Sequence, residues 1–339
     1  MQLLTSRKIH VRNTEKPTSV LVCGTGSRVP EQIIPNDWFA GRVETNDEWI
    51  RTRTGILERR FVSEGQSTTT MALDAARKAL ANSDLDAKDL DMIICATVTP
   101  DMMCPAVACQ LQAQLECRNI PSFDVSAACT GFIYALSIAE QFIRSGAAQH
   151  ILVVGSESLS RAMDLTDRNS CILFGDGAGA VILGASDVKD VGIHSVNVYA
   201  DGTLGHLITV PSMHTKQISQ GTRSDFLEMN GREVFKFAVR KMIELMQEGM
   251  EQCHAMGKQL DLVVPHQVNK RIIDAALEQN GFPADQVMVN LQYYGNTSAA
   301  SVPIALDEAV TSGKAKPGDT LLLIAFGGGL TWGSSLITL

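Results

Sequence analysis

Apolar, β-rich stretches alternate with helical patterns along almost the whole chain, and this alternation restricts the fold more than any other feature. Strands that alternate with crossover helices imply sheets rich in parallel pairs, with helices packed on their faces. The stretch 171–186 predicts two strands around a glycine turn, and 201–230, with weak periodicity, predicts a lid or substrate loop. In the first half we expect strands at 18–30, 90–100, 120–129 and 150–160, and helices at 68–85, 105–116 and 130–146.

A similar order of elements returns in the second half. We expect a long amphipathic helix at 231–254, strands at 261–269, 287–291 and 320–329, and helices at 269–281 and 298–313, and the stretch 331–339 closes the chain. The pattern therefore predicts an α/β protein of two similar halves, 18–190 and 191–339. An N-terminal extension, 1–17, precedes them, and no function is assigned to it.

The charge balance and the apolar content exclude several classes of protein. With 29 basic and 37 acidic residues the formal charge is −8, whereas a nucleic-acid binder that relies on phosphate contacts carries the opposite balance. The sequence has no run of 18 apolar residues and no secretory signal, so we expect a cytoplasmic protein that does not enter a membrane. Charged residues make up only 19%, which indicates that part of the surface is covered by a second layer or by a partner chain.

The eight cysteines, the histidines and the glycine motifs predict no disulfide framework, metal or cofactor. No two cysteines form a C-x-x-C pair, and several lie in apolar runs, as small core residues do. Seven scattered histidines disfavour a metal cluster. GDGAGA at 175–180 has the spacing of a dinucleotide fingerprint, but it is followed by VILGA, which predicts a strand rather than a helix.

Three residues with useful chemistry stand where a predicted strand gives way to a helix. Cys129 would lie near the positive end of a helix, which favours the thiolate; the alternative is a buried cysteine that fills a corner. His266 ends a strand, where α/β proteins place active sites, although a lone histidine is more often structural. Asn296 precedes a helix and could simply cap it. Together they are a thiol, an imidazole and an amide, each at a strand-to-helix junction of one predicted α/β protein.

Six longer motifs stand in order along the chain: DEWIRTRTGI (47–56), DVSAACTGFIYAL (124–136), TDRNSCILFGDGAGAV (166–181), VPHQVNKRII (264–273), YGNTSAASVPIALDEA (294–309) and AFGGGLTWGS (325–334). These motifs resemble those of the β-ketoacyl-acyl-carrier-protein synthase III family, which initiates type II fatty-acid synthesis. The resemblance runs from about residue 18 to 339. It implies a thiolase-like fold of two similar α/β halves in five layers, αβαβα, and a homodimer.

The resemblance also implies a ping-pong condensation. Cys129 would take the acyl group from a short acyl-CoA, and backbone N–H groups of Cys129 and Gly328 would form the oxyanion hole. His266 and Asn296 would then stabilise the enolate made by decarboxylation of malonyl-acyl-carrier protein. Acyl-CoA is a substrate here, and no cofactor or metal is expected. Two alternatives remain: a condensing enzyme or acyltransferase of a polyketide or other secondary pathway, and a non-catalytic dimeric CoA-binding paralogue.

The same resemblance places further residues in substrate binding. Trp49 and Arg53 would hold the CoA adenine between them, Arg168 would contact its base or phosphate region, and Asn269 would bond the pantetheine. Without the resemblance, each has a plainer reading, such as a solvated charge for Arg53. The implied CoA-binding residues are Trp49, Arg53, Arg168, Phe235, Asn269 and Arg271, with Phe235 and Arg271 near the tunnel mouth.

Two departures from the family pattern bear on specificity. Cys104 stands where relatives with a strict acetyl preference often carry phenylalanine, at a position that reaches the acyl pocket across the dimer. Its small side chain predicts room for primers longer than acetyl. Some lysines of relatives are absent after His266, so carrier-protein docking would depend on basic residues that otherwise form a solvated face: Lys236, Arg240, Lys241 and Arg271.

Overall fold

The computed structural model describes residues 17–211 and 226–339. Nearly all of the expected extension 1–17, and the middle of the expected loop 201–230, lie outside the described residues. Two sheets organise the rest of the chain. The first has the strand order β1 (Ser19–Arg28), β7 (Asp176–Ser186), β6 (His150–Ser158), β4 (Met92–Ala96) and β5 (Ser122–Val125). The second has the order β11 (Leu262–Pro265), β12 (Thr320–Gly327), β13 (Thr331–Thr338) and β8 (Gly192–Ala200).

Both sheets are mixed, which corrects the expectation of sheets rich in parallel pairs. β4 runs parallel to β5 and β6, and β11 parallel to β12, but β7 is antiparallel to both of its neighbours, as is β13. The reason is clearest at β12 and β13, because only three residues separate these strands and a short hairpin forces them to run in opposite directions.

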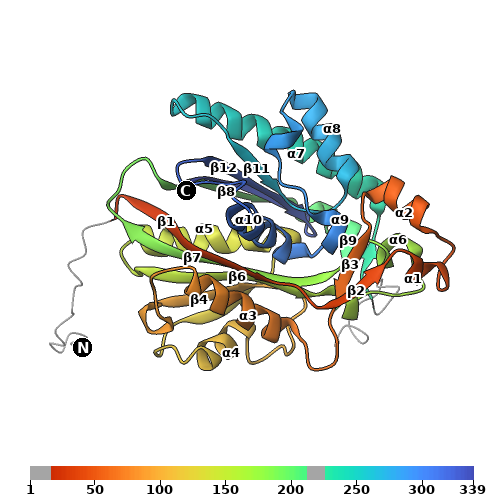
Figure 1. The fold of residues 1–339 in the computed structure, drawn as a ribbon, viewed down its shortest axis with the longest axis horizontal. Helices are drawn as coiled ribbons and strands as arrows, with labels where there is room; N and C mark the ends of the chain where they lie inside the picture. Colours follow the sequence, from red (N-terminus) through yellow and green to blue (C-terminus); the bar gives the residue numbers. More distant parts are fainter. Residues whose placement is uncertain (1–16, 212–225) are drawn as a thin grey trace, which may run out of the picture.

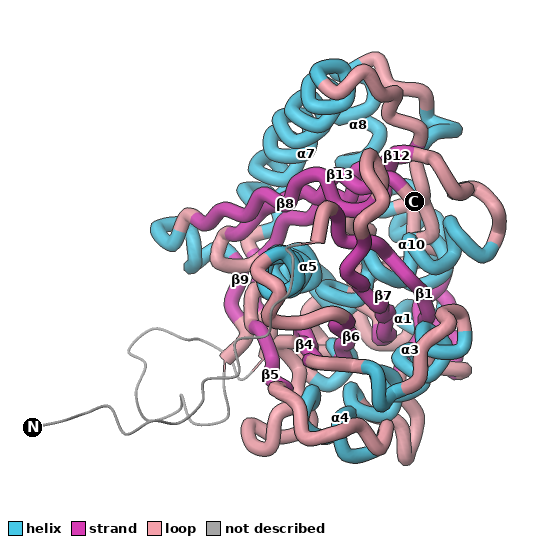
Figure 2. The backbone as a smooth tube through the Cα atoms, turned by 90° about the vertical axis from the view of Figure 1, so that its left-hand side faces the viewer, coloured by secondary structure: helices cyan, strands magenta, loops and turns pink. Residues whose placement is uncertain are grey.

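Helices and sheets stack in five layers (Figure 1). The outer face of the first sheet is covered by α3 (Thr68–Ala81) and α4 (Val107–Gln114). The space between the sheets holds α5 (Gly131–Arg144) and α10 (Ser301–Thr311). The outer face of the second sheet is covered by α7 (Gly231–Ala255) and α8 (Lys270–Asn280). The view at right angles shows α5 end-on between the two sheets (Figure 2). The five-layer α/β architecture is the predicted one.

Two predicted elements are wrong in detail. The stretch 171–186 holds one long strand, β7, after the short helix α6 (Arg168–Cys171). Its glycines do not make a turn but let α10 approach, since a Cβ at Gly179 would lie 2.6 Å from the Ile304 nitrogen. The stretch 287–291 is not a strand, because the N–H groups of Asn290 and Leu291 donate to the Gln267 side chain instead.

The strands of each sheet come from one side of residue 190, so both chain halves contribute a complete sheet. The division into two halves otherwise stays a prediction. Shorter elements extend the end of the stack at which the site lies: β2 (Gln32–Pro35), α1 (Asp37–Ala40), α2 (Asp47–Thr54), β3 (Glu58–Phe61), β9 (Ile208–Thr209), β10 (Glu228–Met229) and α9 (Leu291–Tyr294). Within the described ranges, no helix is both long and apolar enough to cross a membrane.

Candidate active site

Cys129 lies on a single 3₁₀ turn, Ala128–Thr130, between the end of β5 and the start of α5. The residue before it, Ala128, has a φ of +47°, so the chain bends sharply as it presents the thiol. Gly327, the last residue of β12, packs directly on this turn, and a Cβ there would lie 2.8 Å from the Cys129 nitrogen. A glycine is therefore needed for the second sheet to reach the nucleophile supplied by the first.

His266 follows β11 and is buried. Its Nδ1 lies 2.6 Å from the Ser301 hydroxyl at the start of α10, and its ring meets Phe326 edge-to-face at 5.6 Å between centroids. Burial lowers the pKa of His266 to about 3, so the imidazole is neutral at physiological pH. If Ser301 donates to Nδ1, Nε2 carries the proton and can act as a donor.

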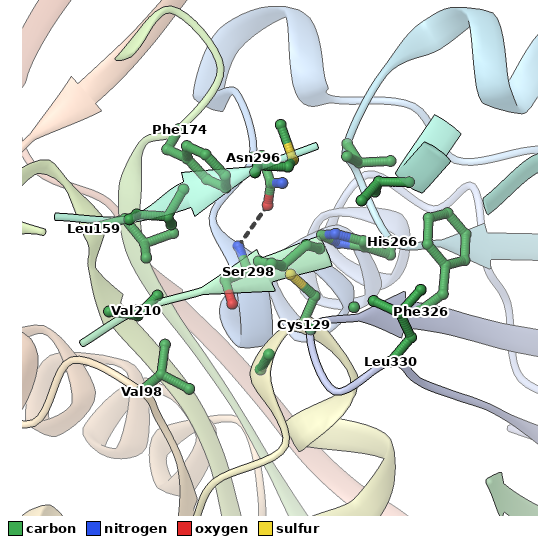
Figure 3. Close-up of a pocket in the computed structure, with 18 of the residues that line it drawn as sticks. Val98, Cys129, Leu159, Phe174, Val210, His266, Asn296, Ser298, Phe326 and Leu330 are labelled. Carbon is green, nitrogen blue, oxygen red and sulfur yellow. Dashed lines mark hydrogen bonds between the residues drawn. The ribbon is translucent and has the colours of Figure 1, made fainter. Parts of the chain in front are cut away.

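Asn296 lies between α9 and the 3₁₀ turn Ser298–Ala300. Its backbone N–H donates to the Leu173 carbonyl at 2.8 Å, and its side-chain Oδ1 accepts from the Ser298 backbone N–H at 2.8 Å (Figure 3). The alternative role, a helix cap, is not confirmed, because neither the Ser298–Ala300 turn nor α10 has a side-chain cap. Because Oδ1 is committed to an N–H donor, the other end of the amide is a donor, Nδ2.

These three side chains line one small cavity of about 50 Å³ (Figure 3). The other walls are almost wholly apolar, and N–H donors act more strongly where water is excluded. Gly328 also lines the cavity, beside Cys129. The apolar walls include Val98, Leu159, Phe174, Val210, Phe326 and Leu330.

The thiol itself differs from the expectation. Although Cys129 keeps some solvent exposure, the pKa of its thiol is raised to about 12, mainly by burial and to a smaller extent by the buried Glu157 carboxylate. The Ser298 hydroxyl acts in the opposite direction. The prediction that the helix terminus favours the thiolate is therefore wrong, because one 3₁₀ turn does not offset the burial of the thiol.

Known proteins resemble the chain over nearly its whole length. Family models for 3-oxoacyl-(acyl-carrier-protein) synthase III match residues 123–202 and, for its C-terminal part, 250–339. A β-ketoacyl-acyl-carrier-protein synthase III of Xylella fastidiosa is 47% identical over 93% of this chain and 97% of its own. This chain belongs to that family. It is a condensing enzyme and an acyltransferase, as the motifs predict.

Solved structures agree with this membership. The synthase III of Aquifex aeolicus is 46% identical with a TM-score of 0.87, covering 95% of this chain and all of that one. The priming β-ketosynthase of the R1128 polyketide pathway is 35% identical with a TM-score of 0.88, covering 96% and 98%. The thiolase-like fold is confirmed, and of these two structures the Aquifex aeolicus enzyme is the more similar in sequence.

The residues predicted to bind CoA do not line this cavity. The Arg168 guanidinium lies 4.9 Å from the Trp49 ring centroid, and that of Arg53 lies 5.9 Å from it. The structure therefore brings the three together, with Arg168 nearer to the ring than Arg53. Asn269 caps α8 by accepting from the Arg271 N–H, and its Nδ2 donates to the Arg53 carbonyl.

The basic residues expected to dock a carrier protein behave differently from one another. Lys236 and Arg240 have largely exposed side chains, although each lies near a glutamate of its own helix. Lys241 is turned inward, because its ammonium pairs with Glu244 at 2.7 Å and lies 4.3 Å from the Trp332 ring centroid. Arg271 lies over Phe235, 5.6 Å from the ring centroid. Lys241 is therefore the weakest of the four candidates.

Cys104 is exposed and does not line the cavity of its own chain. Its expected role concerns a partner's pocket, and it stays a prediction. The sequence reasoning missed Ser298, Ser301 and Phe326, although all three lie in quoted motifs. It also missed Glu157, for which a carboxylate inside an apolar strand was the available signal.

Proposed function

We propose that this chain condenses a short acyl-CoA with malonyl-acyl-carrier protein through an acyl-Cys129 intermediate, and so initiates fatty-acid synthesis. One observation carries the proposal: a thiol, a neutral imidazole and an amide donor converge on one apolar cavity from three separate segments of the chain. The reaction needs N–H donors near a thioester oxygen and no strong acid that would protonate a carbanion. His266 and Asn296 meet this requirement.

The first half-reaction transfers the acyl group. The Cys129 sulfur attacks the thioester carbonyl, and the N–H groups of Cys129 and Gly328 hold the oxyanion. The bond from carbon to the CoA sulfur then breaks, and the thiol proton of Cys129 leaves with CoA. Because burial raises the pKa of Cys129 to about 12, the proton is lost only as attack occurs, when substrate dipoles replace the missing water.

The second half-reaction forms the carbon–carbon bond. Loss of carbon dioxide from the malonyl group leaves an electron pair that becomes an enolate, whose oxygen accepts from His266 Nε2 and Asn296 Nδ2. The enolate carbon attacks the acyl-Cys129 carbonyl, the bond to sulfur breaks, and the Cys129 thiolate recovers a proton from solvent. In the proposed mechanism, neither half-reaction uses a cofactor or a metal. In the described ranges, no group of three or more His, Cys, Asp or Glu side chains is arranged to hold a metal ion.

Substrate binding follows the arrangement outside the cavity. Trp49 with Arg168, and Arg53 beside them, provide the planar and cationic faces that suit a purine and its phosphates. Asn269 would bond the pantetheine, Phe235 and Arg271 would line the entrance, and exposed Lys236 and Arg240 would meet an acidic carrier protein. We propose the cytoplasm as the location of this reaction.

We propose that a second copy of the chain binds at the β5 edge of the first sheet. β5 is an edge strand, and exposed Met102 and Met103 lie next to it, along a cleft of about 790 Å³ that shares Val98 with the active site. In such a homodimer, the partner's Cys104 would reach the acyl pocket. Sedimentation of wild type and Met103→Glu checks this: the variant should dissociate, and a wild type that sediments as a monomer would remove the basis for the Cys104 role.

The nucleophile is tested by the intact mass of the protein after mixing with a panel of acyl-CoAs. Wild type should gain the mass of each accepted acyl group, graded by chain length, whereas Cys129→Ser should gain none within the same time. An adduct of equal yield on both proteins would place the nucleophile elsewhere. Binding of CoA with no adduct from any acyl-CoA would favour the non-catalytic reading.

A further inference from the structure

Glu157 is a buried carboxylate close to the active site that the reaction above does not use. It stands near the end of β6, with its side chain fully enclosed. Two residues earlier, Gly155 lets β6 touch the turn that follows Asn296, since a Cβ at Gly155 would lie 2.2 Å from the Ala299 carbonyl oxygen. The strand that carries Glu157 is thus in direct backbone contact with the Asn296 segment.

The partners of Glu157 in the described part of the chain come from two segments far apart in sequence. From the end of β4, the Thr99 hydroxyl donates at 2.5 Å, the Thr99 N–H at 3.1 Å, the Val98 N–H at 3.1 Å and the Thr97 hydroxyl at 3.2 Å. From the Asn296 segment, the Ser298 hydroxyl donates at 3.2 Å. One carboxylate therefore links a cavity wall to the segment that holds the amide donor.

Ser298 is the residue through which Glu157 reaches the chemistry. The φ of Ser298, +50°, is unfavourable for residues other than glycine, so the surrounding contacts must impose this backbone conformation. Its hydroxyl is tied to Glu157, while its backbone N–H holds Asn296 Oδ1 at 2.8 Å. If the hydroxyl lost its anchor, the N–H would be freer to move, and the Asn296 amide would lose its fixed orientation.

We propose that Glu157 is a positioning residue for the condensation half-reaction, acting through Ser298 to aim the Asn296 donor at the enolate oxygen. The inference rests on the proposed function, since it assigns that role to Asn296. Burial raises the pKa of Glu157 to about 7, so the carboxyl titrates near physiological pH. The five neutral donors act against burial, because they stabilise the ionised form. Acylation of Cys129 makes no use of Asn296, and removing the Glu157 charge lowers the pKa of the Cys129 thiol, so Glu157→Gln should not slow acylation.

The experiment separates the two half-reactions in Glu157→Gln, Ser298→Ala and the double variant. Acylation is followed by quenched intact mass with acetyl-CoA, and the second half by release of carbon dioxide from malonyl-carrier protein. We expect Glu157→Gln to slow carbon dioxide release roughly 100-fold, the scale for a misplaced catalytic group, and to change acylation less than about threefold. The KM for acetyl-CoA should be unchanged. Ser298→Ala should slow carbon dioxide release by more than it slows acylation, which it affects only by removing the hydroxyl that lowers the Cys129 pKa. For carbon dioxide release, the double variant should be no worse than the more impaired single variant, because both cut one link.

Asp307→Asn is the matched control. Asp307 is also a buried carboxylate held by neutral donors, the hydroxyls of Thr25 and Ser27, but it does not line the cavity. It should lose thermal stability without changing the ratio of the two rates. If Glu157→Gln does not fold, Ser298→Ala carries the test alone.

Three outcomes would overturn the proposal. They are equal slowing of both half-reactions, additive effects in the double variant, and slower acylation with unchanged carbon dioxide release, which would make Glu157 a proton acceptor for Cys129. A failure of the proposed function itself would look different, because wild type would then form no acyl-Cys129.

Discussion

The cavity and its rim hold their functional side chains in opposite ways. In the cavity, His266 and Asn296 are buried and fixed by short bonds to neutral groups, the Ser301 hydroxyl and the Ser298 N–H. We call the residues outside the cavity that are predicted to bind CoA or the carrier protein the rim: Trp49, Arg53, Arg168, Lys236 and Arg240. Cations of the rim meet aromatic rings or carboxylates at longer range, such as Arg240 at 3.9 Å from Glu244. The first arrangement fixes positions, which a transition state requires, and the second accumulates weak and salt-sensitive attraction. Cavity substitutions should therefore change kcat, and rim substitutions should change KM.

The largest effect expected in this comparison comes from removing one cavity donor. Asn296→Ala or His266→Ala should lower kcat for condensation roughly 10²–10³-fold, the usual cost of one oxyanion donor, with little change in KM for acyl-CoA. Asn290→Ala is the control, since Asn290 is also buried but bonds to Glu308 away from the cavity. Steady-state kinetics of the three variants measure this. An increase in KM alone for Asn296→Ala would erase the distinction between cavity and rim.

Rim aromatic and cationic residues should give an intermediate effect. Trp49→Ala or Arg168→Ala should raise KM for acyl-CoA about tenfold, as expected for loss of a stacking or cation–π contact of 1–2 kcal/mol, and leave kcat nearly unchanged. Arg42→Ala removes the closer contact of Arg42 with Trp38, 3.5 Å from its ring centroid, and should not change KM. If all three variants raised KM equally, the effect would come from the fold and not from CoA.

The burial of His266 should also make the stability of the protein depend on pH. The pKa of His266 is lowered to about 3, so below about pH 6.5 the unfolded chain gains a proton that the folded chain refuses. Its contribution to stability is therefore lost progressively as the pH falls from 6.5 towards 3. Urea unfolding measures this. Between pH 8 and pH 5, the free energy of unfolding should fall by about 2 kcal/mol less in His266→Asn than in wild type.

Glu157 supplies the opposite sign for the same measurement. Burial raises its pKa to about 7, so the folded chain holds a proton that the unfolded chain releases above about pH 4.5. Glu157→Gln should consequently show a larger loss of stability between pH 8 and pH 5 than wild type. A shift of the same sign in both variants would show that one of the two pKa directions is wrong.

The smallest effect should come from exposed rim charges. Lys236→Glu with Arg240→Glu should raise KM for the carrier protein several-fold at low salt, and the difference should shrink by 0.5 M salt because exposed charges are screened. Lys241→Gln, which changes an inward-facing residue, should lower the free energy of unfolding and leave this KM nearly unchanged. Unchanged KM for the double reversal at low salt would remove these two residues from docking.

Much of the fold and the three central residues could be predicted from sequence, for physical reasons. Cys129, His266 and Asn296 stand at ends of segments with clear periodicity, and the surrounding motifs are long. The prediction of a strand at 287–291 was wrong because this apolar segment has the composition of a strand, while two of its backbone N–H groups donate to the Gln267 side chain. The pKa of Cys129 could not be predicted, since its burial depends on Gly327 and Phe326, about 200 residues away. The link between Glu157 and Ser298, 141 residues apart, leaves no local pattern.

The central claim is that one thiol carries the acyl group while two buried donors stabilise the enolate. Release of carbon dioxide from malonyl-carrier protein by wild type, Cys129→Ala and Asn296→Ala tests it most directly. We expect Cys129→Ala to release carbon dioxide still, within about tenfold of wild type, while forming no condensation product, and Asn296→Ala to lose about 100-fold. Loss of decarboxylation in Cys129→Ala, or its full retention in Asn296→Ala, would contradict the proposed mechanism.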